Sequence, residues 1–239
     1  GQLSGRFNRM AQRLRQNLKD SLRQQRELNE AQIRMMQAQL NPHFLYNTLD
    51  TIKWMGKIHQ APEIATISAD LADILRSSIS ADELVPLRQE LRLVERYVEI
   101  QNIRFSGAFA LTVEVDEPLR DVPVPKLMLQ PLVENALIHG CEAKSGKIVI
   151  SIRLTTQDEY LSVSVQDNGI GMEPEALSAL QTKLACCDDP GLERNDAGNI
   201  GLVNIQRRIH LKFGSQYGVQ IISEAGSGTT ATLLLPRRE

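Results

Sequence analysis

The chain has 239 residues, of which 42% are hydrophobic and 23% are charged, and its formal net charge is -2. This length suits two modest domains, and this composition excludes wholesale disorder and fibrous repeats. The near-neutral charge, with no long Lys/Arg block, excludes nucleic acid from the expected partners. No apolar stretch approaches the roughly 20 residues that cross a bilayer, and no signal peptide is evident, so the chain as given is expected to be soluble.

The sequence opens on a segment, residues 6–36, that is rich in Gln, Arg, Leu and Glu and contains no Pro or Gly. Such a segment favours one long helix. Its apolar residues step by three and four and then change phase, in the order Phe7, Met10, Leu14, Leu18, Leu22 and Leu28. We interpret the pattern as a short coiled coil with a phase shift; an exposed helix with a narrow apolar stripe is the alternative.

Three more amphipathic helices follow, so residues 1 to about 105 are expected to be mainly helical. The second helix ends near Gly56, and the fourth begins after Pro86, a residue favoured at a helix start. The apolar faces of the three helices are, in chain order, Leu45, Leu49, Ile52 and Met55; Ile64, Ile67, Leu71 and Ile74; and Leu87, Leu91, Val94 and Val98.

The pattern changes after Gly107, where Leu111, Val113 and Val115 alternate with polar residues as in a half-buried strand. Helices are predicted over residues 126–139, 175–184 and 200–213, with a loop over residues 188–198. Further strands are predicted over residues 147–154, 160–166, 217–223 and 229–235, the first two as an antiparallel pair joined by a polar turn at 155–159. This mixture predicts an α/β sandwich with a helical layer on one face.

Four short polar and glycine-rich motifs lie in this second half. They are Leu132-Val133-Glu134-Asn135-Ala136, Asp167-Asn168-Gly169-Ile170-Gly171, Gly198-Asn199-Ile200-Gly201-Leu202 and Gly226-Ser227-Gly228-Thr229. A carboxylate such as Asp167 accepts a hydrogen bond from the exocyclic amine of adenine, whereas guanine carries a carbonyl there. Gly169 and Gly171 let the backbone pass close to a base. Taken singly, the Asp-Asn-Gly motif favours an ordinary turn, and the Gly-Ser-Gly-Thr motif is equally compatible with a hairpin turn.

Two of the motifs suit the phosphates and their metal. The amide of Asn135 offers an oxygen to Mg²⁺, which takes few protein ligands, although a polar residue on a helix surface is the plain alternative. Gly198 and Gly201 precede a helix whose free N–H groups and positive dipole end can meet phosphates. The loop at residues 185–198 is then the expected lid over the nucleotide.

Together, in this order, the motifs resemble the N, G1, G2 and G3 boxes of the GHKL or Bergerat ATP-binding fold of histidine kinases, DNA gyrase, Hsp90 and MutL, over residues 108–236. The resemblance implies ATP and Mg²⁺ as cofactors, Leu202 in the nucleotide site, and Thr229 as a support for the Asp. Pro131 stands where ATP-hydrolysing members have a water-activating Glu, which disfavours hydrolysis. Ile138 stands where many histidine kinases have a phosphate-contacting Lys or Arg; His139 and Lys144 are the substitutes that we consider.

A phosphoacceptor is expected in the helical half, where His43 follows Pro42 in Asn41-Pro42-His43-Phe44-Leu45-Tyr46-Asn47. A neutral imidazole can attack phosphorus, and Pro42 should break or restart the helix beside it. His43, Asn47 and Asp50 share one helical face, so Asn47 is a candidate to orient the imidazole and Asp50 is the nearest carboxylate. Phe44 occupies the place of the acid that commonly follows the phosphorylated His.

Three segments resemble the LytS/YesM class of bacterial sensor histidine kinases: the His43 motif, Tyr97 to Phe105, and Gln130 to Asn135. The resemblance implies an α+β chain with a signalling helix (1–35), a helical-hairpin dimerisation and phosphotransfer domain (36–105) that forms a four-helix bundle in the homodimer, and an ATP-binding α/β sandwich (106–239). It implies ATP-dependent autophosphorylation on His43 and transfer to an Asp of a response regulator.

The same resemblance extends to the first segment, which is similar to the last helix of a HAMP relay. It implies that transmembrane and sensor parts lie upstream, so that the chain is the cytoplasmic portion of a bacterial membrane protein. Two alternatives remain open at this point: a GHKL-fold ATPase, and a nucleotide-gated dimeric scaffold without kinase activity.

Overall fold

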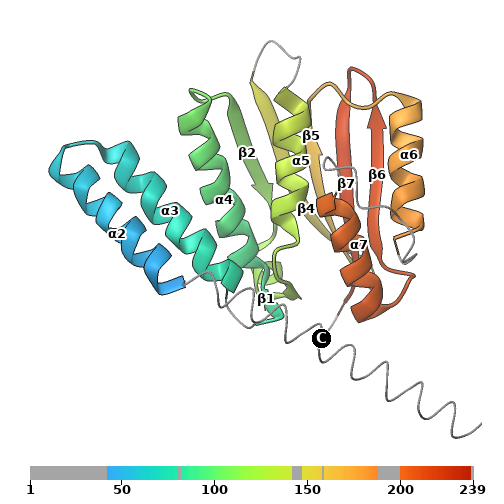
Figure 1. Ribbon diagram of the computed structural model, residues 1–239. Coiled ribbons are helices and arrows are strands. Elements are labelled where there is room, and N and C mark those ends of the chain that lie inside the picture. Colours follow the sequence, from blue (N-terminus) through green and yellow to red (C-terminus); the bar gives the residue numbers. More distant parts are fainter. Residues whose placement is uncertain (1–41, 80–81, 142–146, 158, 188–199, 238–239) are drawn as a thin grey trace, which may run out of the picture.

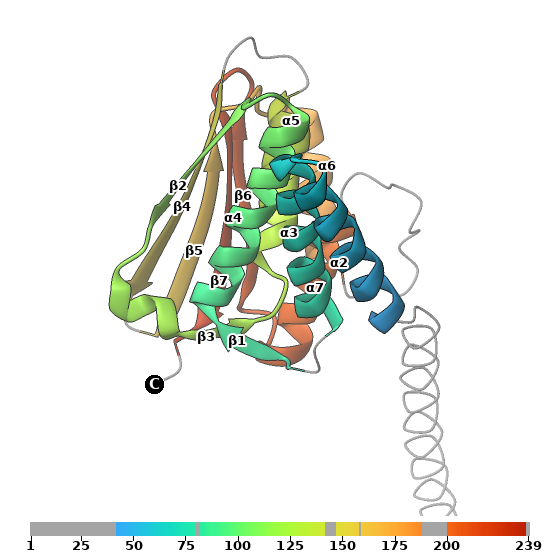
Figure 2. The same ribbon diagram turned by 90° about the vertical axis from the view of Figure 1, so that its left-hand side faces the viewer.

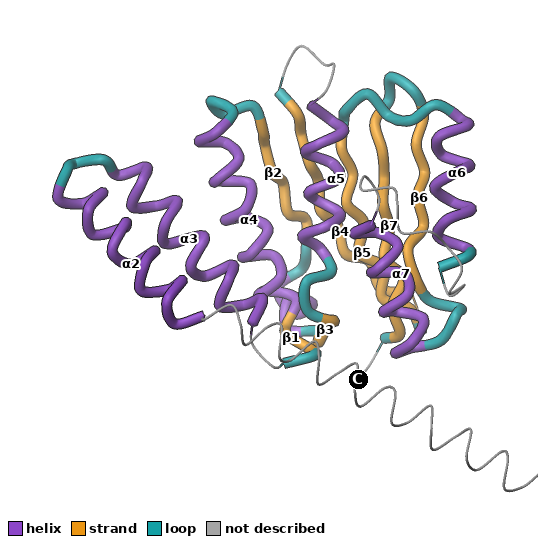
Figure 3. The backbone as a smooth tube through the Cα atoms, in the orientation of Figure 1, coloured by secondary structure: helices purple, strands orange, loops and turns teal. Residues whose placement is uncertain are grey.

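The computed structural model describes residues 42–79, 82–141, 147–157, 159–187 and 200–237. It comprises a helical hairpin beside a five-stranded sheet that carries helices (Figures 1 and 3). The predicted coiled coil at residues 1–35, the loop at 188–198, Gly198 and Lys144 lie outside the described residues. None of the described helices is long and apolar enough to cross a membrane.

The hairpin consists of α2 (Pro42–Ile58) and α3 (Pro62–Ile79). The first helix ends at Ile58, two residues after Gly56, near which its end was predicted, because Gly56 packs closely against α3 and does not terminate the helix. A Cβ atom at Gly56 would lie 2.9 Å from the backbone nitrogen of Ala65 in α3. Of the predicted apolar face, Leu45 and Leu49 are partly buried, whereas in the single chain Ile52 is 38% and Met55 is 54% exposed.

Helix α4 (Leu87–Arg104) begins directly after Pro86, as predicted. Before it lies β1 (Leu84–Pro86), which pairs antiparallel with β3 (Pro123–Pro125), and a short 3-10 helix, η1 (Glu117–Asp121), precedes β3. The sequence indicated neither short strand. The predicted apolar face of α4 is confirmed, because Leu87, Leu91, Val94 and Val98 are buried in the same core as the sheet.

The sheet has the order β2-β4-β5-β7-β6 and consists of β2 (Phe109–Glu114), β4 (Ile148–Gln157), β5 (Tyr160–Asp167), β7 (Gly228–Pro236) and β6 (Gly218–Glu224). The predicted antiparallel pair is confirmed as β4 and β5, and its turn is shorter than expected because β4 continues to Gln157, opposite Tyr160. Strand β2 runs parallel to β4.

The helices α4, α5 (Leu129–Cys141), α6 (Pro174–Ala185) and α7 (Ile200–Phe213) form a layer on one face of the sheet. Figure 2, turned by 90°, shows the strands on one side and the helices on the other. The expectation of an α+β chain with a helical hairpin and an α/β sandwich is confirmed. Helix α5 starts three residues later than predicted, because Leu127 has a φ of 57°, which is not helical.

A charged contact joins the hairpin to this layer. Arg96 of α4 contacts Asp73 of α3, and its Nη1 atom also lies 3.4 Å from Oδ1 of Asp70, a buried side chain of α3. Two carboxylates thus share one guanidinium at the α3–α4 contact.

Candidate nucleotide site

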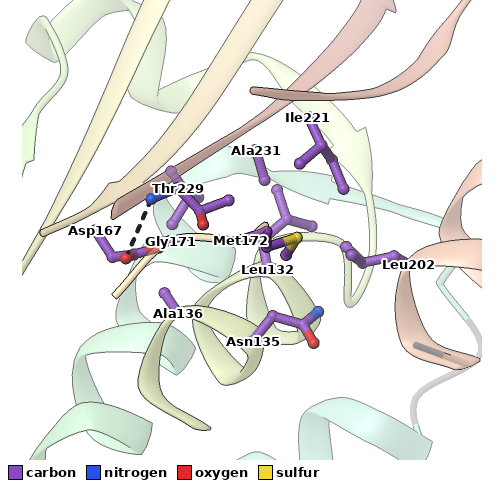
Figure 4. A pocket seen from close by; sticks show the side chains of 11 residues that line it. Leu132, Asn135, Ala136, Asp167, Gly171, Met172, Leu202, Ile221, Thr229 and Ala231 are labelled. Atoms are coloured by element: carbon purple, nitrogen blue, oxygen red, sulfur yellow. Dashed lines mark hydrogen bonds between the residues drawn. The ribbon is translucent and has the colours of Figure 1, made fainter. Parts of the chain in front are cut away.

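A pocket lies between α5, the end of β5, the first turn of α7 and the β6–β7 pair (Figure 4). Its walls are mainly apolar, with one carboxylate, one amide and one hydroxyl among them. The lining residues are Leu132, Asn135, Ala136, Val165, Asp167, Gly171, Met172, Leu202, Ile221, Thr229 and Ala231. Four separate motifs therefore contribute residues to one pocket, namely Asn135, Asp167, Gly171, Leu202 and Thr229.

Asp167 is the last residue of β5 and is only 7% exposed. Its Oδ1 atom accepts hydrogen bonds from the backbone N–H of Gly169 at 2.8 Å and of Thr229 at 3.3 Å. Hydrogen bonds from two backbone donors offset part of the cost of burying a carboxylate and fix its orientation. The carboxylate is thus held in one orientation on the pocket wall.

The loop after Asp167 interlocks with the β6–β7 turn. Gly171 has a φ of 67°, and a Cβ atom there would lie 1.9 Å from the carbonyl oxygen of Glu224. From the other side, the N–H of Gly226 donates to the carbonyl oxygen of Ile170 at 2.6 Å. The second and fourth motifs therefore shape each other, and only glycine fits at position 171.

Thr229 supports Asp167 through its backbone N–H, not its hydroxyl. The hydroxyl lies 2.8 Å from Oγ of Ser223, its register partner across the β6–β7 pair. The same Oγ atom accepts a hydrogen bond from the N–H of Met172 at 2.9 Å. The sequence motifs included neither Ser223 nor Met172; for Ser223, the alternation of β6 opposite the Gly-Ser-Gly-Thr turn was the available signal.

Asn135 lies on α5, and its Nδ2 donates to the carbonyl oxygen of Pro131 at 2.8 Å. With the amide nitrogen used in this way, the amide oxygen is the atom left to serve a ligand. The neighbouring Glu134 accepts a hydrogen bond from Gln130 at 2.9 Å and does not line the pocket. Its carboxylate also faces Tyr97 of α4: burial first, and the charge of Glu134 second, raise the pKa of Tyr97 above its usual 10.0.

The start of α7 closes the pocket beside α5. Leu202 is buried in the pocket wall, and a Cβ atom at Gly201 would lie 3.3 Å from Cβ of Pro131. Ile138, at the place where a cation is common, is 55% exposed. Of its two expected substitutes, Lys144 and the side chain of His139 lie outside the described residues.

His43 lies in the first turn of α2 and is exposed. Nδ2 of Asn47 lies 3.2 Å from Nδ1 of the imidazole, so the expected neighbour is in contact. Asp50 is occupied elsewhere, with its Oδ1 atom 3.6 Å from Nζ of Lys53. Neither His43 nor its neighbours on α2 line the pocket.

Comparison with known families identifies both halves of the chain. A family model described as "Histidine kinase" matches residues 31–109, and one described as "Histidine kinase-, DNA gyrase B-, and HSP90-like ATPase" matches residues 121–239. A histidine kinase domain from the blue-light activated histidine kinase of Erythrobacter litoralis superposes with a TM-score of 0.45 and 18% identity, covering 82% of this chain and 94% of that one. That likeness is too distant to inform the site.

Curated relatives match along the chain more closely. Sensor histidine kinase YesM of Bacillus subtilis (strain 168) is 33% identical over 239 residues, which are 100% of this chain and 39% of the relative. Sensor protein kinase HptS of Staphylococcus aureus is 35% identical over 214 residues, which are 89% of this chain and 39% of the relative. The chain thus spans about two fifths of the length of these relatives. With both family models and these relatives in agreement, the chain belongs to the sensor histidine kinase family, in the group related to YesM.

Proposed function

We propose that this chain binds Mg²⁺-ATP in the pocket, transfers the γ-phosphoryl group to His43, and passes it on to an Asp of a response regulator. The observation that carries the proposal is the fixed carboxylate of Asp167 in an otherwise apolar wall. The planar adenine base fits between apolar walls, and the carboxylate can accept a hydrogen bond from its exocyclic amine. Guanine would present a carbonyl oxygen to the same carboxylate and be rejected, because two acceptors would then face each other.

Asn135 is the residue that we propose for Mg²⁺. Its hydrogen bond to Pro131 uses the amide nitrogen and leaves the amide oxygen for a ligand, and a hard cation prefers oxygen. When bound, the metal would neutralise phosphate charge, while the rest of the catalysis is positioning. Pro131 has no group that can accept a proton from water, which favours transfer to a protein acceptor over hydrolysis.

His43 is the proposed acceptor because it is exposed at the start of α2 and its Nδ1 is in contact with Asn47. Turned through 180°, the Asn47 amide would present its oxygen to a protonated Nδ1 and leave the Nε2 lone pair outward. Nε2 would then attack the γ-phosphorus, the bond to the β-phosphate oxygen would break, and ADP would leave. A phosphoramidate on His43 is reactive enough to pass the group to a carboxylate.

A homodimer is part of the proposal. In the single chain, α2 and α3 leave Ile52, Met55, Ile64 and Leu71 exposed. A second hairpin would cover these side chains and complete a four-helix bundle. By analogy with sensor kinases, we place the chain on the cytoplasmic side of a cell membrane. The proposal involves no contact between the described residues and lipid.

The test is incubation of the full chain with γ-labelled ATP and Mg²⁺, comparing His43→Gln with His59→Gln. Both substitutions replace an exposed histidine in the hairpin region. Label that is retained in His59→Gln and lost in His43→Gln supports the assignment, and label that survives in His43→Gln overturns it. Steady phosphate release without a labelled protein would indicate an ATPase, and nucleotide binding without either would indicate a scaffold.

A further inference from the structure

One charged side chain in the core has no role in the mechanism above. Glu90 lies in the first turn of α4 and is 1% exposed. Its Oε1 accepts the backbone N–H of Leu127 at 2.7 Å, and its Oε2 accepts those of Met128 and Leu129 at 2.8 and 3.2 Å. All three donors belong to the segment where α5 begins.

This arrangement is a helix cap supplied by another helix. The first N–H groups of a helix have no partner inside the helix, and a negative charge at that end is favourable. Leu127 lies just before α5 with a φ of 57°, a conformation that an L-residue other than Gly or Asn adopts only at a cost. The three bonds to Glu90 hold the backbone in that conformation, so they determine where α5 starts and how it is rotated.

The rotation of α5 matters for the pocket. Leu132, Asn135 and Ala136 of this helix form one wall. The Asn135 amide is itself fixed to the first turn through the carbonyl oxygen of Pro131. A continuous series of contacts therefore connects Glu90 to the N–H of Leu129, the first turn of α5 to Pro131, and Pro131 to the amide of Asn135.

We propose that Glu90 is a positioning residue for the metal-nucleotide: from α4 it holds the first turn of α5 and thereby aims the Asn135 amide oxygen at the Mg²⁺ that accompanies ATP. The inference rests on the proposed function of the pocket. It also joins the two matched regions, because Glu90 lies within residues 31–109 and Asn135 within residues 121–239. A movement of α4 would reach the metal ligand through this carboxylate.

The test uses calorimetric titration of the full chain with ADP, once with Mg²⁺ and once with EDTA, on wild type and Glu90→Gln. A glutamine keeps one acceptor oxygen but presents an NH₂ group to the other backbone donors. Residues that orient metal ligands change metal affinity by about 10–100-fold when replaced, so we expect the Mg²⁺-ADP affinity to fall at least about tenfold. Affinity for ADP in EDTA should stay close to wild type. Equal losses in both conditions, or no loss in either, overturn the inference.

Two further variants keep the result interpretable. Glu99→Gln makes the same change of charge at an exposed site of α4, and its binding should match wild type in both conditions. Glu90→Gln/Leu127→Gly removes the cost of the positive φ, so it restores the fold where the single variant is unstable. If the double variant regains the wild-type melting temperature but not the wild-type affinity for ADP in Mg²⁺, the result supports a positioning role for Glu90. If it regains both, the inference is overturned. Wild type that binds no nucleotide would instead refute the proposed function.

Discussion

Replacing Gly171 by Ala tests the interlock between the loop after Asp167 and the β6–β7 turn. The new Cβ atom would lie 1.9 Å from the carbonyl oxygen of Glu224, whereas ordinary van der Waals contact begins at 3.4 Å. One of the two segments must therefore move by about 1.5 Å, the difference between these two distances. A movement of that size separates the loop from the turn on which its shape depends.

The cost can be worked out from the contacts that this movement breaks. An alanine at a positive φ costs about 1 kcal/mol. The shift also breaks the Gly226–Ile170 and Met172–Ser223 hydrogen bonds, at about 1 kcal/mol each. We expect a loss of about 3 kcal/mol in the free energy of unfolding. If half of it falls on the loop of the proposed nucleotide site, we expect Mg²⁺-ADP binding to weaken about tenfold, because 1.4 kcal/mol is a factor of ten.

Gly226→Ala is the matched control, since Gly226 has a φ of 82° but no atom within 4 Å of the new Cβ. It should carry only the backbone cost of about 1 kcal/mol and bind ADP like wild type. Urea unfolding and calorimetric titration measure both quantities. Equal ADP affinities of Gly171→Ala and Gly226→Ala, or equal losses of their free energies of unfolding, would refute the interlock.

Two other predictions concern α4. Arg96→Ala leaves the buried Asp70 without its cation, so we expect the free energy of unfolding, measured in urea, to fall by about 2 kcal/mol. The exposed Arg92→Ala should show no measurable loss, and equal stability of the two variants would contradict the prediction. Because burial and then Glu134 raise the pKa of Tyr97, the folded protein becomes less stable as the pH rises above 10.0, the range in which the unfolded tyrosine ionises first. Tyr97→Phe should lack this decline, and a difference titration of tyrosinate absorbance that places Tyr97 at or below 10.0 would refute it.

The parts of the site that sequence analysis predicted are those set by local chemistry. Asp167 ends a strand and is followed by the glycines that its motif requires, so residue type and order were enough to single it out. The same holds for Asn135, which one turn of helix connects to Pro131. Within the fold, the faces of α4 and β4 follow from alternation and helical period, which a linear pattern records.

What the sequence did not predict depends on residues that are far apart in the chain. Glu90 and its three backbone donors are separated by 37 to 39 positions, and the donors are backbone groups that carry no residue signature. Arg96 and Asp70 are 26 positions apart on different helices. The exposure of Ile52 and Met55 was equally hidden, because an apolar helical face looks the same in sequence whether its partner is the same chain or a second copy.

The boundary predicted between residues 105 and 106 is open to a direct test, because α4 contributes to the core of the sheet. Leu87, Leu91, Val94 and Val98 are all buried there, and burying one such side chain is worth about 1.5–3 kcal/mol. The four together supply on the order of 6–12 kcal/mol, as much as the whole stability of a typical domain. A fragment of residues 84–239 should therefore melt cooperatively, and one of residues 106–239 should not. Cooperative melting of the shorter fragment at a similar temperature would refute this and would support a catalytic domain that begins at residue 106.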